Sequence, residues 1–283
     1  MKKDAYNRIL EKTFDLKIPF AVLWELTYRC NLSCLHCYAT NRDGKGELSL
    51  REIEAVLKQL AEAGCLFLTF TGGEIFCRTD LVPILRSAKS KGFALRLFTN
   101  GTLITPERAD QLVEIEPLAV EFSLYSRGPA IHDRITGKKG SHRQTLSAIR
   151  LCVERQLNTV IKCALQKHNR AEFRSLRDFA EDIGARFVFD FMLVPADDGS
   201  RPMARHGLSE QDIYEFIRTH AAPDRRLPPR PDLSAPLCGA EALRLVHAAA
   251  LAGELGEGAA EHGAVLTEIH SQAAAGGVGT CVP

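Results

Sequence analysis

The sequence has little of what marks several classes of protein. Its 36 Lys and Arg residues nearly balance 35 Asp and Glu residues, so the net charge is +1 and gives no overall attraction for nucleic acid or an anionic membrane. It has no apolar run long enough to span a bilayer, and its first residues lack the apolar stretch of a secretion signal. Nine cysteines in 283 residues are too few for a disulfide scaffold. We expect a cytoplasmic globular protein that binds neither nucleic acid nor membrane, with its cysteines reduced or bound to metal.

Aromatic residues are missing from the last part of the chain, because no Phe, Trp or Tyr follows Phe216. Residues 221–236 are rich in proline, which is typical of a linker, and residues 237–283 are rich in Ala and Gly. Such a composition offers little large apolar surface to bury. We expect an N-terminal segment at 1–20, a core domain at 21–220, a linker at 221–236 and an irregular tail at 237–283.

Within the expected core domain, short apolar runs alternate with amphipathic segments. The runs are rich in Phe, Val, Leu and Ile, as buried parallel strands are. They lie at 22–27, 66–72, 94–100, 118–124, 159–165 and 186–193. Helices are expected to begin near capping residues, which are Ser49, Asp80, Thr105, Ser141, Asn169 and Ser209.

Repeated strand–helix units predict an α/β fold with a parallel sheet, since parallel strands need long crossover connections. The pattern leaves two arrangements open, a doubly wound open sheet or a full or partial barrel. In both, functional residues lie at the carboxyl ends of the strands.

Three cysteines, Cys30, Cys34 and Cys37, follow the first expected strand directly. Three thiolates in one loop can bind zinc or an iron–sulfur cluster. Zinc prefers four tetrahedral ligands, commonly from two close pairs, and this sequence offers a single such pair in Cys34 and Cys37. A cubane cluster suits the spacing better, because three cysteines hold three irons and leave the fourth open. A structural zinc knuckle is the alternative.

Polar and glycine residues also lie at the ends of the next expected strands, and one of them lies within the fifth strand. These residues form a second set of candidates for cofactor binding. They are Gly72, Gly73, Glu74, Asn100, Ser123 and Lys162. Two neighbouring glycines allow close backbone approach, and a glutamate can pair with an ammonium group. Ordinary strand-end turns are the simpler interpretation of the same residues. Cys77, Tyr125 and Arg127 lie at the same expected edge and are further candidates for contact with substrate.

The three-cysteine spacing C-x3-C-x2-C, with Gly-Gly-Glu after the second strand, resembles the radical S-adenosylmethionine (radical SAM) superfamily. The resemblance covers about residues 20–220 and implies a partial (β/α)6 barrel of TIM type. It implies that Cys30, Cys34 and Cys37 bind a [4Fe–4S] cluster whose open iron holds SAM. Reductive cleavage of SAM then yields a 5′-deoxyadenosyl radical that abstracts hydrogen from a substrate. An electron donor such as flavodoxin or ferredoxin is implied as a partner.

The same resemblance implies a role for each strand-end candidate. The Gly-Gly-Glu motif holds the methionine end of SAM, and Asn100 belongs to a turn that is common in the family. Ser123 matches a position that contacts the ribose or carboxylate of SAM, and Lys162 borders the adenine.

The segments 23–34, 72–76 and 132–141 most resemble radical SAM enzymes with a C-terminal SPASM or twitch extension, which mostly modify ribosomally made peptides. A precursor peptide is therefore the expected substrate. Tetrapyrrole-modifying relatives share much of the pattern and are the alternative, as is a truncated product that only binds cluster and SAM. Cys238 resembles the opening of such an extension, but Cys281 is the only cysteine beyond it. We expect a remnant tail that binds no auxiliary cluster.

Overall fold

A computed structural model of the chain describes residues 11–40 and 42–220. Its centre is one six-stranded parallel sheet in which every strand pairs with its neighbour in sequence. The strands are β1 (Ala21–Thr27), β2 (Phe67–Gly72), β3 (Ala94–Thr99), β4 (Ala119–Ser123), β5 (Thr159–Ala164) and β6 (Arg186–Asp190). The expected strands are all present, with ends that differ by up to a few residues.

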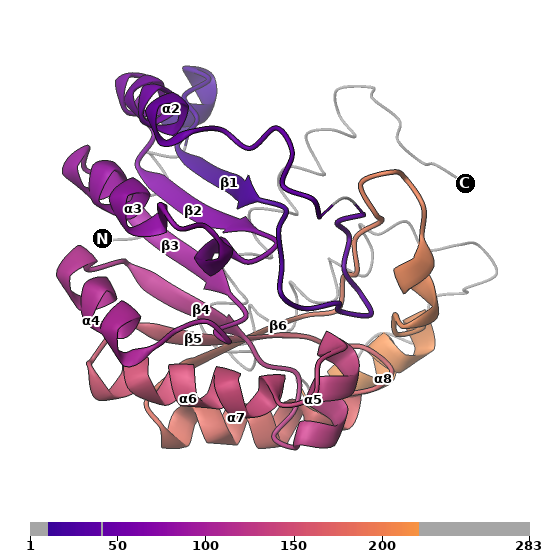
Figure 1. Cartoon of the computed structure of the whole chain (residues 1–283). Helices are drawn as coiled ribbons and strands as arrows, with labels where there is room; N and C mark the ends of the chain where they lie inside the picture. The colour runs from indigo at the N-terminus through magenta and orange to yellow at the C-terminus, as the bar shows by residue number, and fades with distance from the viewer. Residues whose placement is uncertain (1–10, 41, 221–283) are drawn as a thin grey trace.

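The helices follow the outer side of this curved sheet, as Figure 1 shows. They are α2 (Leu50–Glu62), α3 (Leu81–Ser90), α4 (Pro106–Ile115), α5 (Pro129–Thr136), α6 (Ser141–Glu154), α7 (Phe173–Asp182) and α8 (Glu210–His220). Short 3-10 helices are η1 (Ile75–Cys77), η2 (Arg170–Glu172) and η3 (Pro202–Arg205). Among the described residues, no helix is long and apolar enough to cross a membrane.

The strand order decides between the two arrangements that the sequence left open. A doubly wound sheet reverses its order at a switch point and carries helices on both faces. Here the order runs from β1 to β6 without reversal, and the helices cover the outer face. The sheet is therefore an open partial barrel, which confirms the fold implied by the resemblance.

Local capping explains where the helices begin. Ser49 and Glu52 form the expected capping box of α2, and Thr105 caps α4. Two expected capping residues do not cap their helices, because their side chains bond elsewhere. The Ser141 hydroxyl donates to Asp133, so Gly140 takes the N-cap position of α6. Asn169 uses its side chain in the loop after β5, and α7 begins later, at Phe173.

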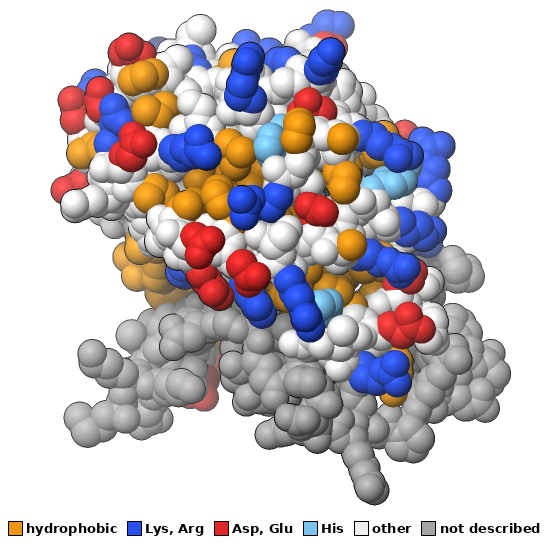
Figure 2. Space-filling view, turned by 90° about the horizontal axis from the view of Figure 1, so that it is seen from below, with side chains coloured by type: hydrophobic (Ala, Val, Ile, Leu, Met, Phe, Trp, Pro, Cys, Tyr) orange, Lys and Arg blue, Asp and Glu red, His pale blue; other side chains and the backbone are white. Residues whose placement is uncertain are grey.

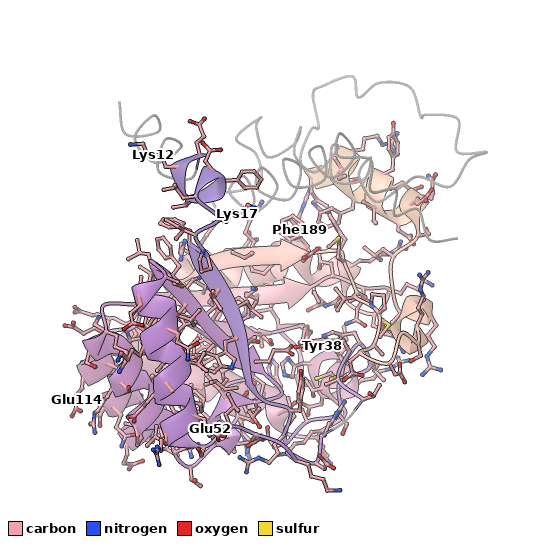
Figure 3. The ribbon with its side chains drawn as sticks, turned by 90° about the horizontal axis from the view of Figure 1, so that it is seen from above. Lys12, Lys17, Tyr38, Glu52, Glu114 and Phe189 are labelled. Carbon is pink, nitrogen blue, oxygen red and sulfur yellow. The ribbon has the colours of Figure 1, made fainter. Side chains whose placement is uncertain are left out.

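The two faces of the sheet differ in chemistry. The largest buried side chains on the strands, Phe70 and Phe122 among them, pack with helix residues in one hydrophobic core. Alternate strand positions point to the opposite, inner face, where the register aligns Phe98 with Glu121 and Ser123 with Lys162. Figure 3 shows Tyr38 beyond the carboxyl end of β1, with Glu52 and Glu114 on the helices of the other side. The inner face and the carboxyl edge therefore carry the polar groups.

Candidate cofactor site

The three motif cysteines lie in the loop that follows β1, at the carboxyl edge of the sheet. Cys30, Cys34 and Cys37 are all half-buried and have free thiols. Two backbone hydrogen bonds attach this loop to the end of α5, from Ser33 N to the Thr136 oxygen at 2.9 Å and from Leu35 N to the Ile135 oxygen at 2.8 Å. The loop is thus held between the strand that precedes it and a helix far along the chain.

The two glycines of the Gly-Gly-Glu motif permit close contact between β2 and the start of the cysteine loop. A Cβ on Gly72 would lie 2.2 Å from the Thr27 oxygen, and a Cβ on Gly73 would lie 2.4 Å from the Arg29 oxygen. The Gly73 amide donates to the Thr27 oxygen at 2.7 Å. Close backbone approach was predicted for these glycines, and in the structure the approaching backbone belongs to the chain itself.

Glu74 is buried and uses both carboxylate oxygens within the protein. Oε1 accepts from the Thr99 hydroxyl at 2.7 Å and from Phe76 N at 3.1 Å, and Oε2 accepts from Asn100 N at 2.7 Å. Burial raises the pKa of Glu74, and these hydrogen bonds oppose the rise. The carboxylate therefore joins the end of β2, η1 and the end of β3.

Asn100 continues this network to the cysteine loop. Its Nδ2 donates to Asn31 Oδ1 at 3.0 Å and lies 4.0 Å from the Cys30 sulfur, while its Oδ1 accepts from Thr102 N at 2.8 Å. Asn31 in turn donates to the Thr102 hydroxyl at 2.8 Å. The structure thus brings together five of the predicted site positions, which are Cys30, Gly72, Gly73, Glu74 and Asn100.

Lys162 lies on the inner face, in a cluster of charged groups. Its Nζ is 3.4 Å from Glu121 Oε2 and 3.6 Å from the centre of the Phe98 ring. Glu121 is buried and also accepts from Arg96 Nε at 2.6 Å. Burial lowers the pKa of Lys162, and Glu121 opposes that effect. Among the described residues, Lys162 contacts Glu121 and Phe98, and its place beside the adenine of SAM stays a prediction.

Ser123 ends β4 beside Lys162, and Tyr125 follows it into the interior. The Tyr125 hydroxyl lies 3.2 Å from His36 Nε2, and Gln166 Nε2 lies 3.2 Å from His36 Nδ1. Burial lowers the pKa of His36 to about 4, so this imidazole is neutral near pH 7. The neutral ring fixes the middle of the cysteine loop against β4 and β5.

The residues present fit an iron–sulfur cluster better than a single metal ion. Burial, and after it the neighbouring Cys30 and Cys37, raise the pKa of Cys34 to about 12, so the three thiols lie within electrostatic range. Yet within the described ranges no three His, Cys, Asp or Glu side chains lie close enough to bind one ion. A cubane places each cysteine on a different iron. The donor set therefore favours the cluster over the zinc knuckle.

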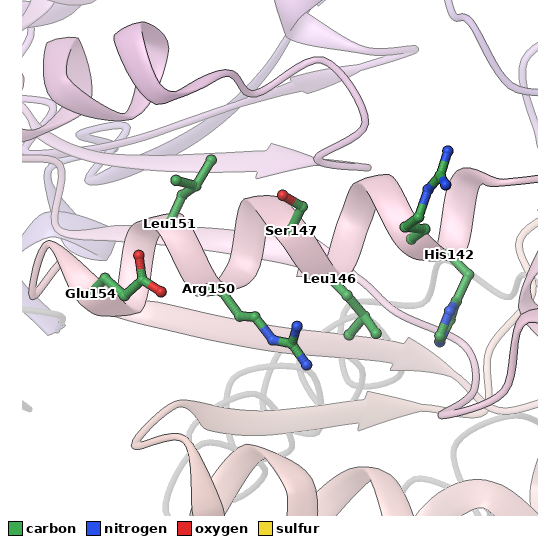
Figure 4. Close-up of a pocket in the computed structure, with 7 residues that line it drawn as sticks. His142, Leu146, Ser147, Arg150, Leu151 and Glu154 are labelled. Atoms are coloured by element: carbon green, nitrogen blue, oxygen red, sulfur yellow. The ribbon is translucent and has the colours of Figure 1, made fainter.

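Several functional candidates were missed by sequence reasoning or lie elsewhere. Asn31, Thr99 and His36 lie next to motif residues, but no pattern in the sequence gave them a role of their own. Their contacts with Asn100, Glu74 and Gln166 form only in the folded chain. The guanidinium carbon of Arg127 lies 4.4 Å from the centre of the ring of Phe179, which belongs to α7. A hollow of about 420 Å³ is lined by residues of α6, shown in Figure 4, and contains none of the predicted site residues.

The structure combines a partial parallel barrel with a loop of three thiols at its carboxyl edge. In barrels of this kind the active site lies at the carboxyl ends of the strands. The family model of the radical SAM superfamily matches residues 24–180. The chain therefore belongs to the radical SAM superfamily, a family of enzymes that use a [4Fe–4S] cluster and SAM. The predicted family and cofactors are confirmed at this level.

The chain is similar to proteins named for tetrapyrrole substrates and to proteins named for peptide substrates. It is 33% identical over 198 residues to the Fe-coproporphyrin III synthase of Methanosarcina barkeri, covering 69% of this chain and 49% of the relative. It is 32% identical over 182 residues to the PqqA peptide cyclase of Bradyrhizobium diazoefficiens, covering 63% and 47%. The structure of Streptococcus suis SuiB bound to S-adenosylmethionine has a TM-score of 0.62 and 16% identity, covering 77% and 51%.

The chain spans about half the length of the curated relatives it matches. The expected linker at 221–236 and tail at 237–283 lie outside the described residues. The division of the chain into these domains therefore stays a prediction.

A methyl group on Gly73 tests the close contact between β2 and the cysteine loop. Because the new Cβ would meet backbone atoms of Tyr28 and Arg29, we expect Gly73→Ala to lower the free energy of unfolding by about 2 kcal/mol or more. Gly92→Ala is the control, since nothing lies within 4 Å of its Cβ position and its φ of +88° costs about 1 kcal/mol. Urea denaturation measures both. A smaller loss at Gly73 than at Gly92 contradicts the steric interpretation.

Removal of the Glu74 carboxylate tests its role as a connector. Glu74→Ala leaves the Thr99 hydroxyl and two backbone amides without their acceptor. We therefore expect it to lower the free energy of unfolding by about 2–4 kcal/mol. Glu62→Ala, at an exposed position on α2, should change it by less than about 0.5 kcal/mol. Thermal and urea denaturation give the comparison, and equal effects of the two changes would rule out the connecting role.

Proposed function

We propose that this chain forms the catalytic core of a radical SAM enzyme that abstracts hydrogen from a ribosomally made peptide. One observation carries the proposal: the Glu74–Asn100–Asn31 network joins the Gly-Gly-Glu motif to the three-cysteine loop. Two motifs that would hold two cofactors are thereby fixed side by side. The barrel would bring the motifs together at the carboxyl edge, where the substrate would also bind.

Each group of residues would have a distinct task in this enzyme. Cys30, Cys34 and Cys37 would hold the cluster. The paired glycines, Asn100 and Ser123 would hold SAM, and Lys162 would lie next to its adenine. When bound, the reduced cluster cleaves SAM and supplies the radical that takes a hydrogen atom. Glu74 would interact with the ammonium group of SAM, and its hydrogen bonds to Thr99, Phe76 N and Asn100 N would hold the motif in place. Buried Tyr125 would hold the cysteine loop through its contact with His36.

A peptide substrate is supported by likeness to two proteins. One is the PqqA peptide cyclase, and the other is SuiB, which has also been solved bound to its precursor peptide SuiA. A tetrapyrrole substrate is the second candidate, because the Fe-coproporphyrin III synthase is similar to the chain at the same level of identity. The two candidates predict different sources of the abstracted hydrogen.

Replacement of the motif cysteines tests the cluster assignment. After anaerobic reconstitution with iron and sulfide, we expect about four irons for the unchanged chain and near none for the Cys30→Ala/Cys34→Ala/Cys37→Ala variant. Cys152→Ala is the matched control, since this cysteine is buried within α6 and should leave the iron content unchanged. Iron and sulfide analysis with visible absorbance gives the readout. An unchanged iron content in the triple variant would refute the assignment.

The substrate class is tested by following hydrogen into 5′-deoxyadenosine. The reconstituted full chain is supplied with SAM, dithionite and either a deuterated precursor peptide of a similar protein, PqqA or SuiA, or deuterated Fe-coproporphyrin III. We expect deuterium in 5′-deoxyadenosine with the peptide only, as detected by mass spectrometry. Transfer from the porphyrin alone would replace the peptide by a tetrapyrrole. No cleavage of SAM with either compound would contradict the catalytic proposal.

A further inference from the structure

Two cations on the inner face of the sheet share a single buried carboxylate. Arg96 donates to Glu121 Oε1 through Nε at 2.6 Å and lies 2.5 Å from the same oxygen through Nη2, while Lys162 Nζ lies 3.4 Å from Glu121 Oε2. We call these three residues the inner charged cluster. Within the described ranges, neither cation forms an ion pair with a second carboxylate. The cluster therefore carries one positive charge more than its carboxylate balances.

This charge balance differs from that of the other cations. Glu47 also pairs with two cations, Arg29 and Arg78, but there Asp80 supplies a second carboxylate, 2.8 Å from Arg78. Many of the remaining Lys and Arg side chains are exposed, and Figure 2 shows them spread over the face seen from below, where Asp and Glu side chains also lie. An exposed cation is stabilised by water, whereas half-buried cations that lie close together repel each other more strongly.

The two cations of the cluster are partly withdrawn from water and act on each other. The side chains of Arg96 and Lys162 are 28% and 31% exposed, and that of Glu121 is 1% exposed. Burial lowers the pKa of Lys162, Glu121 opposes this, and the like charge of Arg96 lowers it again, while Asp190 on β6 has a weaker opposing effect. A second anion on the cluster would reduce the repulsion between the cations.

The guanidinium of Arg96 is already oriented for such an anion. Its Nε and Nη2 edge faces Glu121, and among the described residues Nη1 donates to no acceptor, so the edge formed by Nη1 and Nη2 is free. Strand register aligns Lys162 with Ser123 at the carboxyl end of β4, and Arg96 with Ala119 at its start. An anion on the free edge would therefore lie inside the barrel, beneath the strand-end residues that would hold SAM.

We propose that Arg96 binds a carboxylate of the substrate on the inner face of the sheet, and that Glu121 is the positioning residue that holds its guanidinium. A guanidinium recognises a carboxylate through two parallel hydrogen bonds. The inference rests on the proposed function and narrows it to a peptide with an Asp or Glu side chain near the residue that loses hydrogen. The propionate groups of a tetrapyrrole offer the same chemistry, so the test has to separate the two sources.

Two matched pairs of probes test the carboxylate subsite. One pair is the PqqA peptide and a form of it in which every Asp and Glu is replaced by Asn and Gln, and the other is Fe-coproporphyrin III and its methyl ester. Each probe is titrated into the reconstituted full chain with SAM bound, with calorimetry for the peptides and visible absorbance for the porphyrins. The variants are Arg96→Gln and Glu121→Gln, and the control is Arg51→Gln at an exposed position on α2. SAM affinity and thermal denaturation are measured for every variant.

We expect the unchanged chain and the control to bind the acidic form of one pair about tenfold more tightly than its neutral form. Arg96→Gln should abolish this preference. Glu121→Gln should increase it about tenfold, because the amide oxygen still accepts from Arg96 but no longer offsets its charge. If Glu121→Gln does not fold, the two probe forms on Arg96→Gln still decide.

Three outcomes would overturn the subsite. They are no preference for the acidic form in either pair, an equal loss of both forms in Arg96→Gln, which is the result of a merely structural role, and an equal loss of SAM affinity, which would assign the carboxylate to SAM. A preference confined to the porphyrin pair keeps the subsite and replaces the peptide by a tetrapyrrole. Binding is measured without cleavage of SAM, so a chain that shows the preference but cleaves no SAM would contradict the proposed function alone.

Discussion

The buried carboxylate of Glu74 is the interaction on which the arrangement of this site depends. It has left water, and it is stabilised because a hydroxyl and two backbone amides replace the lost hydration. Those donors come from η1 and from the end of β3, so the carboxylate sets the distance between neighbouring strand ends. Through Asn100 the same constraint reaches Asn31 and the first cysteine. A polar network buried in this way holds one geometry, because each alternative leaves a donor unpaired.

The partial barrel gives this network its place. Parallel strands bring all their carboxyl ends to one edge, and crossover helices cover the outer face with apolar side chains. The inner face is left for polar groups, of which Arg96, Glu121 and Lys162 form the charged centre. The cysteine loop spans the carboxyl edge and is attached to α5 by backbone hydrogen bonds. It therefore lies between the carboxyl edge of the sheet and α5.

Local patterns in the sequence determined the strands, most helix starts, the three thiols and the Gly-Gly-Glu motif, because apolar periodicity, capping and short spacings act within a few residues. Tertiary structure alone decided the barrel, since strand order depends on which side each crossover packs. It also decided the partners of Glu74, Lys162 and His36. The contact of Asn100 with Asn31 spans 69 positions and that of Gln166 with His36 spans 130. Such pairs form only when strand register brings the two side chains together, and no local pattern contains that register.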